Sequence, residues 1–191
     1  APAPERPTLV ARTQAARLVR RFGDDTLSFF KLRNDIQYLF TPTRTAFLGY
    51  RVQHGVMVIS GDPVGDHDAF PDLLDQAIVF ARAHALRLAV LGAGVQTRPM
   101  YEEVGMRSIY LGDEAIIDTQ AFSLDGRPIR KVRQSVTRLT KAGYTALLCR
   151  AGDLGAEELA DLERVSAQWR GGEPERGFSM AMDRIDPVAH P

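Results

Sequence analysis

The spacing of apolar and polar residues changes along the chain from helical to strand-like and back, and this order predicts the fold. Apolar positions three and four residues apart predict helices over 9–22, 68–85 and 156–169 and a short helix at 100–104. Alternating or continuous apolar runs predict strands over 45–52, 56–60, 86–91, 106–111, 115–118 and 144–150. The turn QHG at 53–55 joins the first two strands into a hairpin. The pattern therefore predicts an α+β fold with a mixed, mostly antiparallel sheet flanked by helices.

Capping residues mark the ends of several predicted helices. Asp66 and Asp68 are candidate N-caps of the second helix, and Gly23, Gly105 and Gly143 each follow a predicted helix as a C′ residue. The predicted buried stripe of the second helix consists of Phe70, Leu73, Leu74, Ala77, Ile78 and Ala81.

Composition excludes some classes of protein. The 191 residues are 45% hydrophobic and 25% charged, which is ordinary for a globular protein. The 24 basic and 24 acidic side chains cancel, so an electrostatic binding surface can arise only from the way the charges are distributed. No apolar stretch approaches the ~20 residues that span a bilayer. The start, APAPERP, indicates a Pro-rich linker over 1–8. Cys149 has no partner for an internal disulfide, and the four histidines show no metal-ligand spacing. We expect neither a metal nor a cofactor.

SGDPVG at 60–65 lies where a phosphate-binding loop stands in many nucleotide- and coenzyme-binding proteins. Asp62 and the following Asp66 and Asp68 would repel a diphosphate, and no basic residue compensates them. Glycine, proline and aspartate are also ordinary turn residues, so the segment is either a simple turn or part of a binding site that does not hold pyrophosphate.

The predicted helix from Pro128 to Ala142 has one strongly basic face. No acidic residue occurs from Gly126 to Arg150. At ~100° per residue the apolar Ile129, Val132, Val136 and Leu139 share one face and are expected to pack against the domain. The basic side chains are Arg127, Arg130, Lys131, Arg138 and Lys141 on the opposite face, with Arg133 on the border. This face either binds RNA phosphates or anionic lipid headgroups, or it is a solvated surface.

Other chemistry-bearing residues are few. In LGDEAIID (111–118), Glu114 could bind an amine or act as a base, or it could be a turn carboxylate paired with an arginine. Cys149 is interpreted as a small buried residue, and Trp169 and Phe178 flank the loop RGGEPERG, which could line a domain junction or belong to the core.

The element order together with MYEEVGM (100–106) is similar to the acyltransferase fold of the GNAT superfamily. In addition, seven collinear segments resemble the soluble part of the aminoacyl-phosphatidylglycerol synthases, also called multiple peptide resistance factors. They are SFFKLRNDIQYLF (28–40), AFLGYRV (46–52), SGDPVG, MYEEVGM, LGDEAIID, FSLDGRPIRKVRQSVTRLTKAGY (122–144) and GFSMAM (177–182).

The resemblance implies a function and an organisation. Family members carry two GNAT-like domains, usually behind a membrane domain, and move an aminoacyl group from aminoacyl-tRNA to phosphatidylglycerol, which repels cationic antimicrobial peptides. We expect a truncated chain with a linker (1–8), a first GNAT-like domain (9–121) and a basic helix with the start of a second GNAT-like domain (122–191). Its place would be the cytoplasmic face of the membrane.

We accordingly predict a fragment of an aminoacyl, first of all lysyl, transferase whose partners are aminoacyl-tRNA, phosphatidylglycerol, the membrane surface and the missing second domain. The alternatives are a non-catalytic module that binds RNA or anionic lipid and a CoA-dependent acetyltransferase, which the absent pyrophosphate loop disfavours. The catalytic residues are left unassigned. Substrate binding is assigned to Gly61, Asp62, Pro63, Gly65, Glu114, Phe178 and Ser179, and phosphate binding to Arg127, Arg130, Lys131, Arg133, Arg138 and Lys141.

Overall fold

The computed structural model describes residues 7–173 and 177–190, which fall into two compact units. One unit comprises the described residues up to Ser108 together with Ala160–Ile185, and the other comprises Ile109–Leu159 and the described residues from Asp186 onward. The predicted linker lies largely outside the described residues, as does the middle of RGGEPERG. The domain boundaries inferred from the sequence therefore remain predictions.

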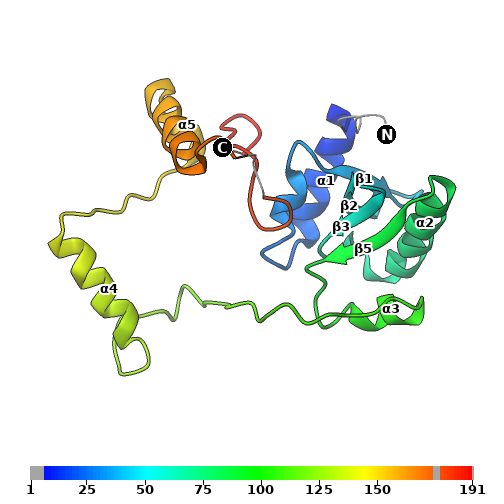
Figure 1. Cartoon of the computed structure of the whole chain (residues 1–191), viewed down its shortest axis with the longest axis horizontal. Helices are drawn as coiled ribbons and strands as arrows, with labels where there is room; N and C mark the ends of the chain where they lie inside the picture. Colours follow the sequence, from blue (N-terminus) through cyan, green and yellow to red (C-terminus); the bar gives the residue numbers. More distant parts are fainter. Residues whose placement is uncertain (1–6, 174–176, 191) are drawn as a thin grey trace. The chain divides into compact units, whose positions relative to one another are not determined.

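The first unit is built on a five-stranded mixed sheet (Figure 1). Its strands are β1 (Gln37–Phe40), β2 (Ala46–Gln53), β3 (Val56–Ser60), β4 (Val64–Gly65) and β5 (Arg87–Leu91). The order is β1-β2-β3-β5, with β4 also paired to β2. All pairs are antiparallel except β3 with β5, which run parallel. The predicted hairpin is confirmed, and His54 and Gly55 turn it with positive φ angles of 49° and 74°.

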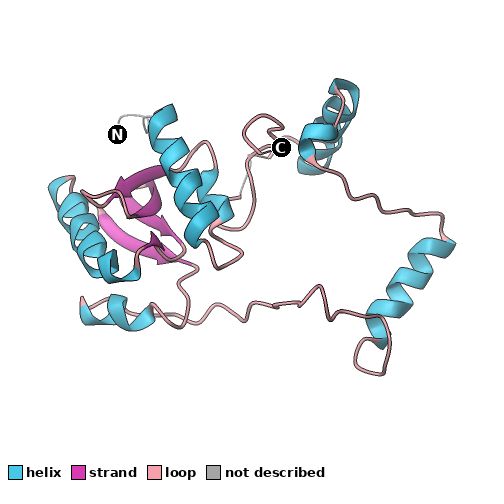
Figure 2. Ribbon diagram, turned by 180° about the vertical axis from the view of Figure 1, so that it is seen from behind, coloured by secondary structure: helices cyan, strands magenta, loops and turns pink. Residues whose placement is uncertain are grey.

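Two helices cover the two faces of this sheet (Figure 2). They are α1 (Leu9–Phe22) and α2 (Phe70–Ala83). The core has two parts, one on each face of the sheet, because successive side chains of β2 point to opposite faces. Leu48 and Tyr50 pack with α2, whereas Phe47 packs with Ala15 and Leu18 of α1.

The α2 stripe shows how the sequence pattern becomes packing. Phe70, Leu73, Leu74, Ala77 and Ala81 are buried as predicted, and Ile78 is half-buried. The helix begins later than predicted, at Phe70, because a 3₁₀ turn, η2 (His67–Ala69), precedes it. Asp66 caps that turn by accepting from the Asp68 amide, whereas Asp68 caps nothing that the structure describes.

The remaining elements are η1 (Phe29–Leu32), α3 (Arg98–Glu103), α4 (Arg130–Lys141), η3 (Ala151–Asp153) and α5 (Ala156–Arg170). α3 and α5 agree with the predicted helices to within two residues, and Gly105 and Gly143 adopt the expected left-handed backbone. α4 begins at Arg130 rather than Pro128, because Pro128 and Ile129 form a turn. Gly23 ends α1 with φ −69°, so it is a C-cap without the left-handed geometry.

Three predicted strands, over 106–111, 115–118 and 144–150, are wrong for the described structure. These segments carry no strand pairing, and their apolar side chains are exposed, including Ile116 and Leu148. Alternating residues form a strand only when a neighbouring strand accepts their backbone hydrogen bonds. The predicted packing of the apolar face of α4 is also wrong, since Val132, Val136 and Leu139 are 43–46% exposed.

Candidate functional site

The segment SGDP is a bulge between two strands that pair with the same neighbour. Tyr50 of β2 pairs with Ile59, and Phe47 pairs with Val64. Between these pairs, two residues of β2, Leu48 and Gly49, lie opposite four residues, Ser60–Pro63, that connect β3 to β4. β4 therefore continues β3 after an insertion, and the insertion turns Asp62 toward the loop that follows β5. We call residues 60–63 the bulge.

Asp62 ties the bulge to that loop. Its carboxylate accepts hydrogen bonds from the Gly94 amide (3.0 Å) and the Thr97 hydroxyl (2.5 Å). Burial raises the pKa of Asp62, the bonds from Thr97 and Gly94 and the nearby Lys31 oppose that rise, and Asp25 adds to it. The carboxylate thus has a structural partner on each oxygen, and this position is not an open turn.

Lys31 of η1 reaches the same place from the other side. Its side chain is completely buried, and its Nζ has no hydrogen-bond partner among the described residues. A Cβ placed on Gly61 would lie 3.0 Å from this Nζ, so the amine lies against the backbone of the bulge. Burial lowers the pKa of Lys31, and the carboxylates of Asp25, Asp62 and Asp24 oppose that change.

Two further buried oxygens around the bulge lack partners among the described residues: Ser60 Oγ and Tyr101 Oη. Burial, followed by the charge of Asp62, raises the pKa of Tyr101, so its hydroxyl stays protonated. Unpaired buried polar groups are rare in folded proteins. Their gathering around the ends of the parallel strands β3 and β5 marks the bulge as the strongest candidate site in the first unit.

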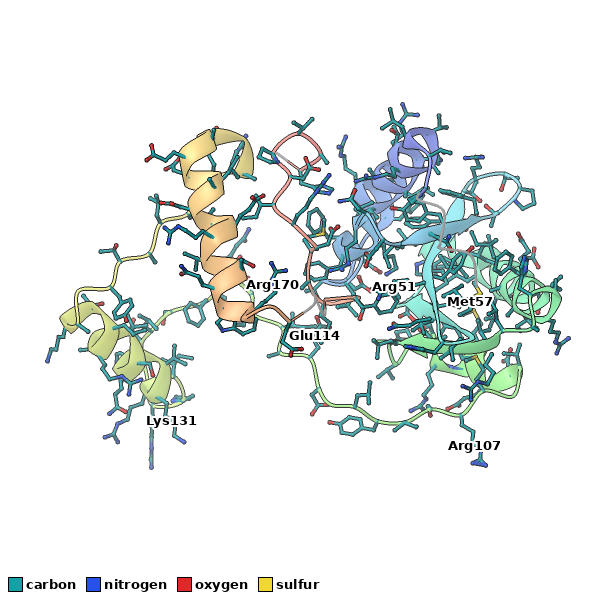
Figure 3. All side chains as sticks on the ribbon, turned by 45° about the horizontal axis from the view of Figure 1, so that its top comes forward. Arg51, Met57, Arg107, Glu114, Lys131 and Arg170 are labelled. Carbon is teal, nitrogen blue, oxygen red and sulfur yellow. The ribbon has the colours of Figure 1, made fainter. Side chains whose placement is uncertain are left out.

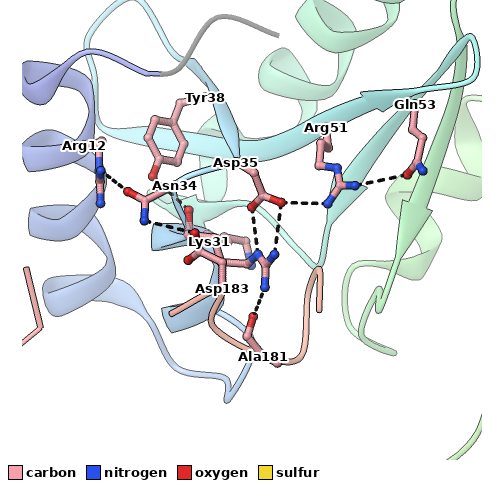
Figure 4. A network of polar contacts seen from close by, with 10 residues as sticks. Arg12, Lys31, Asn34, Asp35, Tyr38, Arg51, Gln53, Ala181 and Asp183 are labelled. Carbon is pink, nitrogen blue, oxygen red and sulfur yellow. Dashed lines mark hydrogen bonds and ion pairs between the residues drawn. The ribbon is translucent and has the colours of Figure 1, made fainter. Parts of the chain in front are cut away.

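A second polar network holds the segment 177–183 on the first unit (Figure 4). Arg33, whose side chain is 1% exposed, donates to both carboxylate oxygens of Asp35 (2.9 and 3.1 Å) and to the Ala181 carbonyl (2.6 Å). Asp35 is also paired with Arg51 (2.8 Å), and the Arg51 guanidinium lies 5.7 Å from the centre of the Phe178 ring. Asn34 donates to Asp183.

The structure brings some predicted site residues together and leaves others apart. Gly61, Asp62, Pro63 and Gly65 all belong to the bulge or to β4, where Gly65 crosses β2 too closely for any side chain. Phe178 is half-buried beside Arg51, and Ser179 is buried. Within the described residues, we find no hydrogen bond or ion pair that joins either of them to the bulge.

Glu114 lies in the second unit, on an exposed extended segment (Figure 3). In the same unit, Arg127, Arg130, Lys131, Arg138 and Lys141 are exposed on or just before α4. Arg133 differs from them, because its guanidinium donates to the carbonyls of Leu124 and Gly126 and so fixes the turn before the helix. The predicted exposure of the five cations on the basic face is therefore confirmed.

Sequence reasoning missed Lys31, Thr97, Tyr101, Arg33 and Asp35. Lys31 and Arg33 lie in SFFKLRND, where charged residues among apolar ones indicate an amphipathic surface, and nothing in that spacing marks a buried cation. Cys149, predicted to be buried, is exposed, and Trp169 is 87% exposed. Within the described ranges we find no cluster of three metal-ligating side chains.

Most of the chain is similar to known proteins. Residues 16–190 match the family described as phosphatidylglycerol lysyltransferase, C-terminal. The chain is 41% identical over 169 residues to the lysylphosphatidylglycerol biosynthesis bifunctional protein LysX of Rhodococcus jostii and 41% identical over 166 residues to that of Mycobacterium tuberculosis. These alignments cover 88% and 86% of this chain but only 15% and 14% of the two relatives.

Solved structures agree in fold. The structure of L-PGS from Bacillus licheniformis, 24% identical, superposes with a TM-score of 0.79 over 97% of this chain and 58% of that one. The C-terminal domain of a protein assigned as a lysylphosphatidylglycerol synthetase from Agrobacterium fabrum, 27% identical, gives 0.80 over 93% of this chain and 56% of that one. The mixed sheet between helices thus confirms the predicted GNAT-like α+β fold. The chain belongs to the family of phosphatidylglycerol lysyltransferase C-terminal regions.

Proposed function

We propose that this chain is part of a transferase that moves an aminoacyl group, first of all lysyl, from aminoacyl-tRNA to phosphatidylglycerol at the cytoplasmic face of the membrane. The observation that carries the proposal is the match to the lysyltransferase family over residues 16–190. The chain spans about 15% of the length of the curated relatives that it matches, so the activity belongs to the longer protein. None of the described helices has the length and apolarity needed to cross a bilayer.

The exposed basic face of α4 supports a role in holding a polyanion. Five cations lie exposed along a segment that contains no acidic residue, in a protein of zero formal net charge. We assign the face to the phosphates of the tRNA donor, with the anionic membrane surface as the competing partner. A non-catalytic module that only binds RNA or anionic lipid remains the second candidate, supported by the same face.

The direct test is an assay of the longer protein in phosphatidylglycerol vesicles with lysyl-tRNA carrying a radioactive lysyl group. We expect labelled lysyl-phosphatidylglycerol to form, and we expect alanyl-phosphatidylglycerol to form more slowly from alanyl-tRNA that carries a labelled alanyl group. Uncharged tRNA with free lysine serves as the control and should give no product. Binding of lysyl-tRNA without any lipid product would favour the second candidate and overturn the transferase proposal.

The basic face yields a quantitative prediction. Replacing Arg130, Lys131 and Lys141 with Ala should weaken binding to anionic vesicles by up to roughly a hundredfold, because each cation near a charged membrane contributes about 1 kcal/mol. The dependence of tRNA binding on salt should become shallower, since fewer counterions are released. Vesicle cosedimentation and tRNA titrations at several salt concentrations measure both effects.

A matched variant controls for net charge. Arg82, Arg87 and Arg107 are exposed in the first unit, and their replacement with Ala removes the same number of positive charges. That triple variant should bind tRNA and vesicles almost as the parent does. If both triple variants lose binding equally, overall charge matters, and α4 has no specific role.

The bulge also predicts weak binding of acetyl-CoA. The Gly61 amide of the bulge already donates to the Leu91 carbonyl, and the Asp66 amide, just after β4, donates to the Thr45 carbonyl. Asp62 adds a carboxylate where a diphosphate would have to lie. Calorimetry should detect no binding at micromolar concentrations. Tight binding that Asp62→Asn strengthens would place the cofactor in the bulge and contradict this prediction.

A further inference from the structure

The amine of Lys31 is a buried group that packing does not explain. Its side chain is 0% exposed, and Nζ has no hydrogen-bond partner among the described residues. An amine without a partner is costly to bury, so an apolar side chain of similar length would serve stability better at this position. Only three of the 24 basic residues in the chain are lysines, and the other two lie exposed on α4.

Two glycines give this side chain its space. A Cβ on Gly49 of β2 would lie 3.5 Å from Lys31 Cβ and 2.9 Å from Ile36 Cγ2. A Cβ on Gly61 would lie 3.0 Å from Nζ. The stem of Lys31 therefore passes over β2 at Gly49, and its amine ends against the bulge at Gly61.

Charge connects the amine to Asp62. The carboxylates that act on Lys31 are those of Asp25, Asp62 and Asp24, and those that act on Asp62 include Lys31 and Asp25. Asp62 also acts on Tyr101 of α3: after the larger effect of burial, its charge raises the pKa of that hydroxyl. Asp25 is already engaged as an acceptor for the amide and hydroxyl of Ser28. Asp62 is the carboxylate that joins this cluster to the loop after β5, through Gly94 and Thr97.

We propose that Lys31 is a positioning residue, which acts through Asp62: its buried amine ends against Gly61 and fixes the bulge, so that the Asp62 carboxylate stays bonded to Gly94 and Thr97. Its importance for aminoacyl transfer rests on the proposed function, whereas the coupling of Lys31 to Asp62 does not. The buried amine then lowers the stability of the fold while it fixes the shape of the bulge, and such a trade-off is common at functional sites.

The coupling can be measured without any activity. With lysine labelled by ¹³C at Cε, the chain gives one signal each for Lys31, Lys131 and Lys141. We expect the pKa of Lys31 to lie below the ordinary value for lysine and to fall further in Asp62→Asn, because a carboxylate that favours its charged form is gone. Asn keeps one acceptor oxygen for Thr97. The signals of Lys131 and Lys141 serve as internal controls, and an unchanged Lys31 titration would overturn the proposal.

The functional part is tested with Lys31→Met in the longer protein. We expect the midpoint of thermal unfolding to stay equal or rise, while kcat for lysyl-phosphatidylglycerol formation falls at least tenfold at little change in KM. Arg82→Met, which alters an exposed cation on α2, should change neither quantity. If Lys31→Met remains fully active, or if stability and activity are lost together, Lys31 is not a positioning residue. If the parent protein forms no lysyl lipid at all, the proposed function fails, while the titration still decides the coupling.

Discussion

Replacing Gly65 with Ala is expected to lower the free energy of unfolding by about 4 kcal/mol, close to the largest effects of single substitutions. Gly65 has φ 136°, and a Cβ there would lie 2.3 Å from the Thr45 carbonyl oxygen and 2.5 Å from Ala46 Cα. Both are backbone atoms of the chain entering β2, so no rotamer change can relieve the contact. Urea unfolding followed by circular dichroism measures the loss.

Gly55→Ala separates this clash from backbone strain. Gly55 also has a positive φ, 74°, but nothing lies within 4 Å of its added Cβ. Its substitution should cost only about 1 kcal/mol, the usual penalty of a left-handed backbone for a residue with a side chain. Equal losses in the two variants would mean that the close approach of β4 to β2 contributes nothing beyond the φ angle.

Replacing Arg33 with Ala is expected to cost about 3 kcal/mol, because it removes a buried side chain together with its hydrogen bonds to Asp35 and to the Ala181 carbonyl, and it leaves a cavity. The segment 177–183 should also lose its anchor, since the bond to the Ala181 carbonyl disappears. Arg33→Met fills most of the volume without the charge, so it should fall between parent and Ala. Hydrogen exchange of residues 177–183, together with urea unfolding, reports both effects.

Arg51→Ala is the matched control. Its side chain is 27% exposed, and Asp35 keeps both bonds from Arg33, so we expect a loss of roughly 1 kcal/mol or less. If Arg51→Ala costs as much as Arg33→Ala, the buried position of Arg33 is not the cause.

Acidification should reduce the difference in the free energy of unfolding between the parent and Arg33→Ala. Partial burial raises the pKa of Asp35, but the hydrogen bond and charge of Arg33 and the charge of Arg51 outweigh it and hold the pKa below its ordinary 3.8. The folded parent therefore binds fewer protons than the unfolded chain near that pH. The stabilisation by this pair is present above about pH 4 and is lost as pH falls through the folded pKa. Unfolding at pH 7 and near pH 3 tests this sign.

Local patterns were sufficient for the helices and the hairpin. The limits of α1 and β3 agree with the predicted ranges, because helical spacing and a continuous apolar run each have one compatible secondary structure there. The basic face of α4 was also predictable, since which residues share a helix face follows from 3.6 residues per turn. Its exposure was predictable for the charged side chains but not for Val132, Val136 and Leu139.

Strand predictions were wrong for segments that have no neighbouring strand to pair with in the described structure. Ile109, Ile116 and Leu147 lie in segments that alternate like strands, yet they remain exposed and unpaired in the described structure. A helix satisfies its backbone hydrogen bonds within its own segment, whereas a strand depends on residues elsewhere in the chain. β1 was missed for the same reason: its four residues are half-buried, and only their pairing with β2 identifies them as a strand.

The sequence by itself determined the family, the order of helices and the basic stretch from Gly126 to Arg150, because these depend on residue identity and local spacing. Only the tertiary structure decided what SGDP is. Pairing of β2 with both β3 and β4 made it a bulge, and the fold brought Lys31, Thr97 and Tyr101 around Asp62. Burial and charge interactions between distant segments are set by packing, so the spacing of residues along the chain does not reveal them.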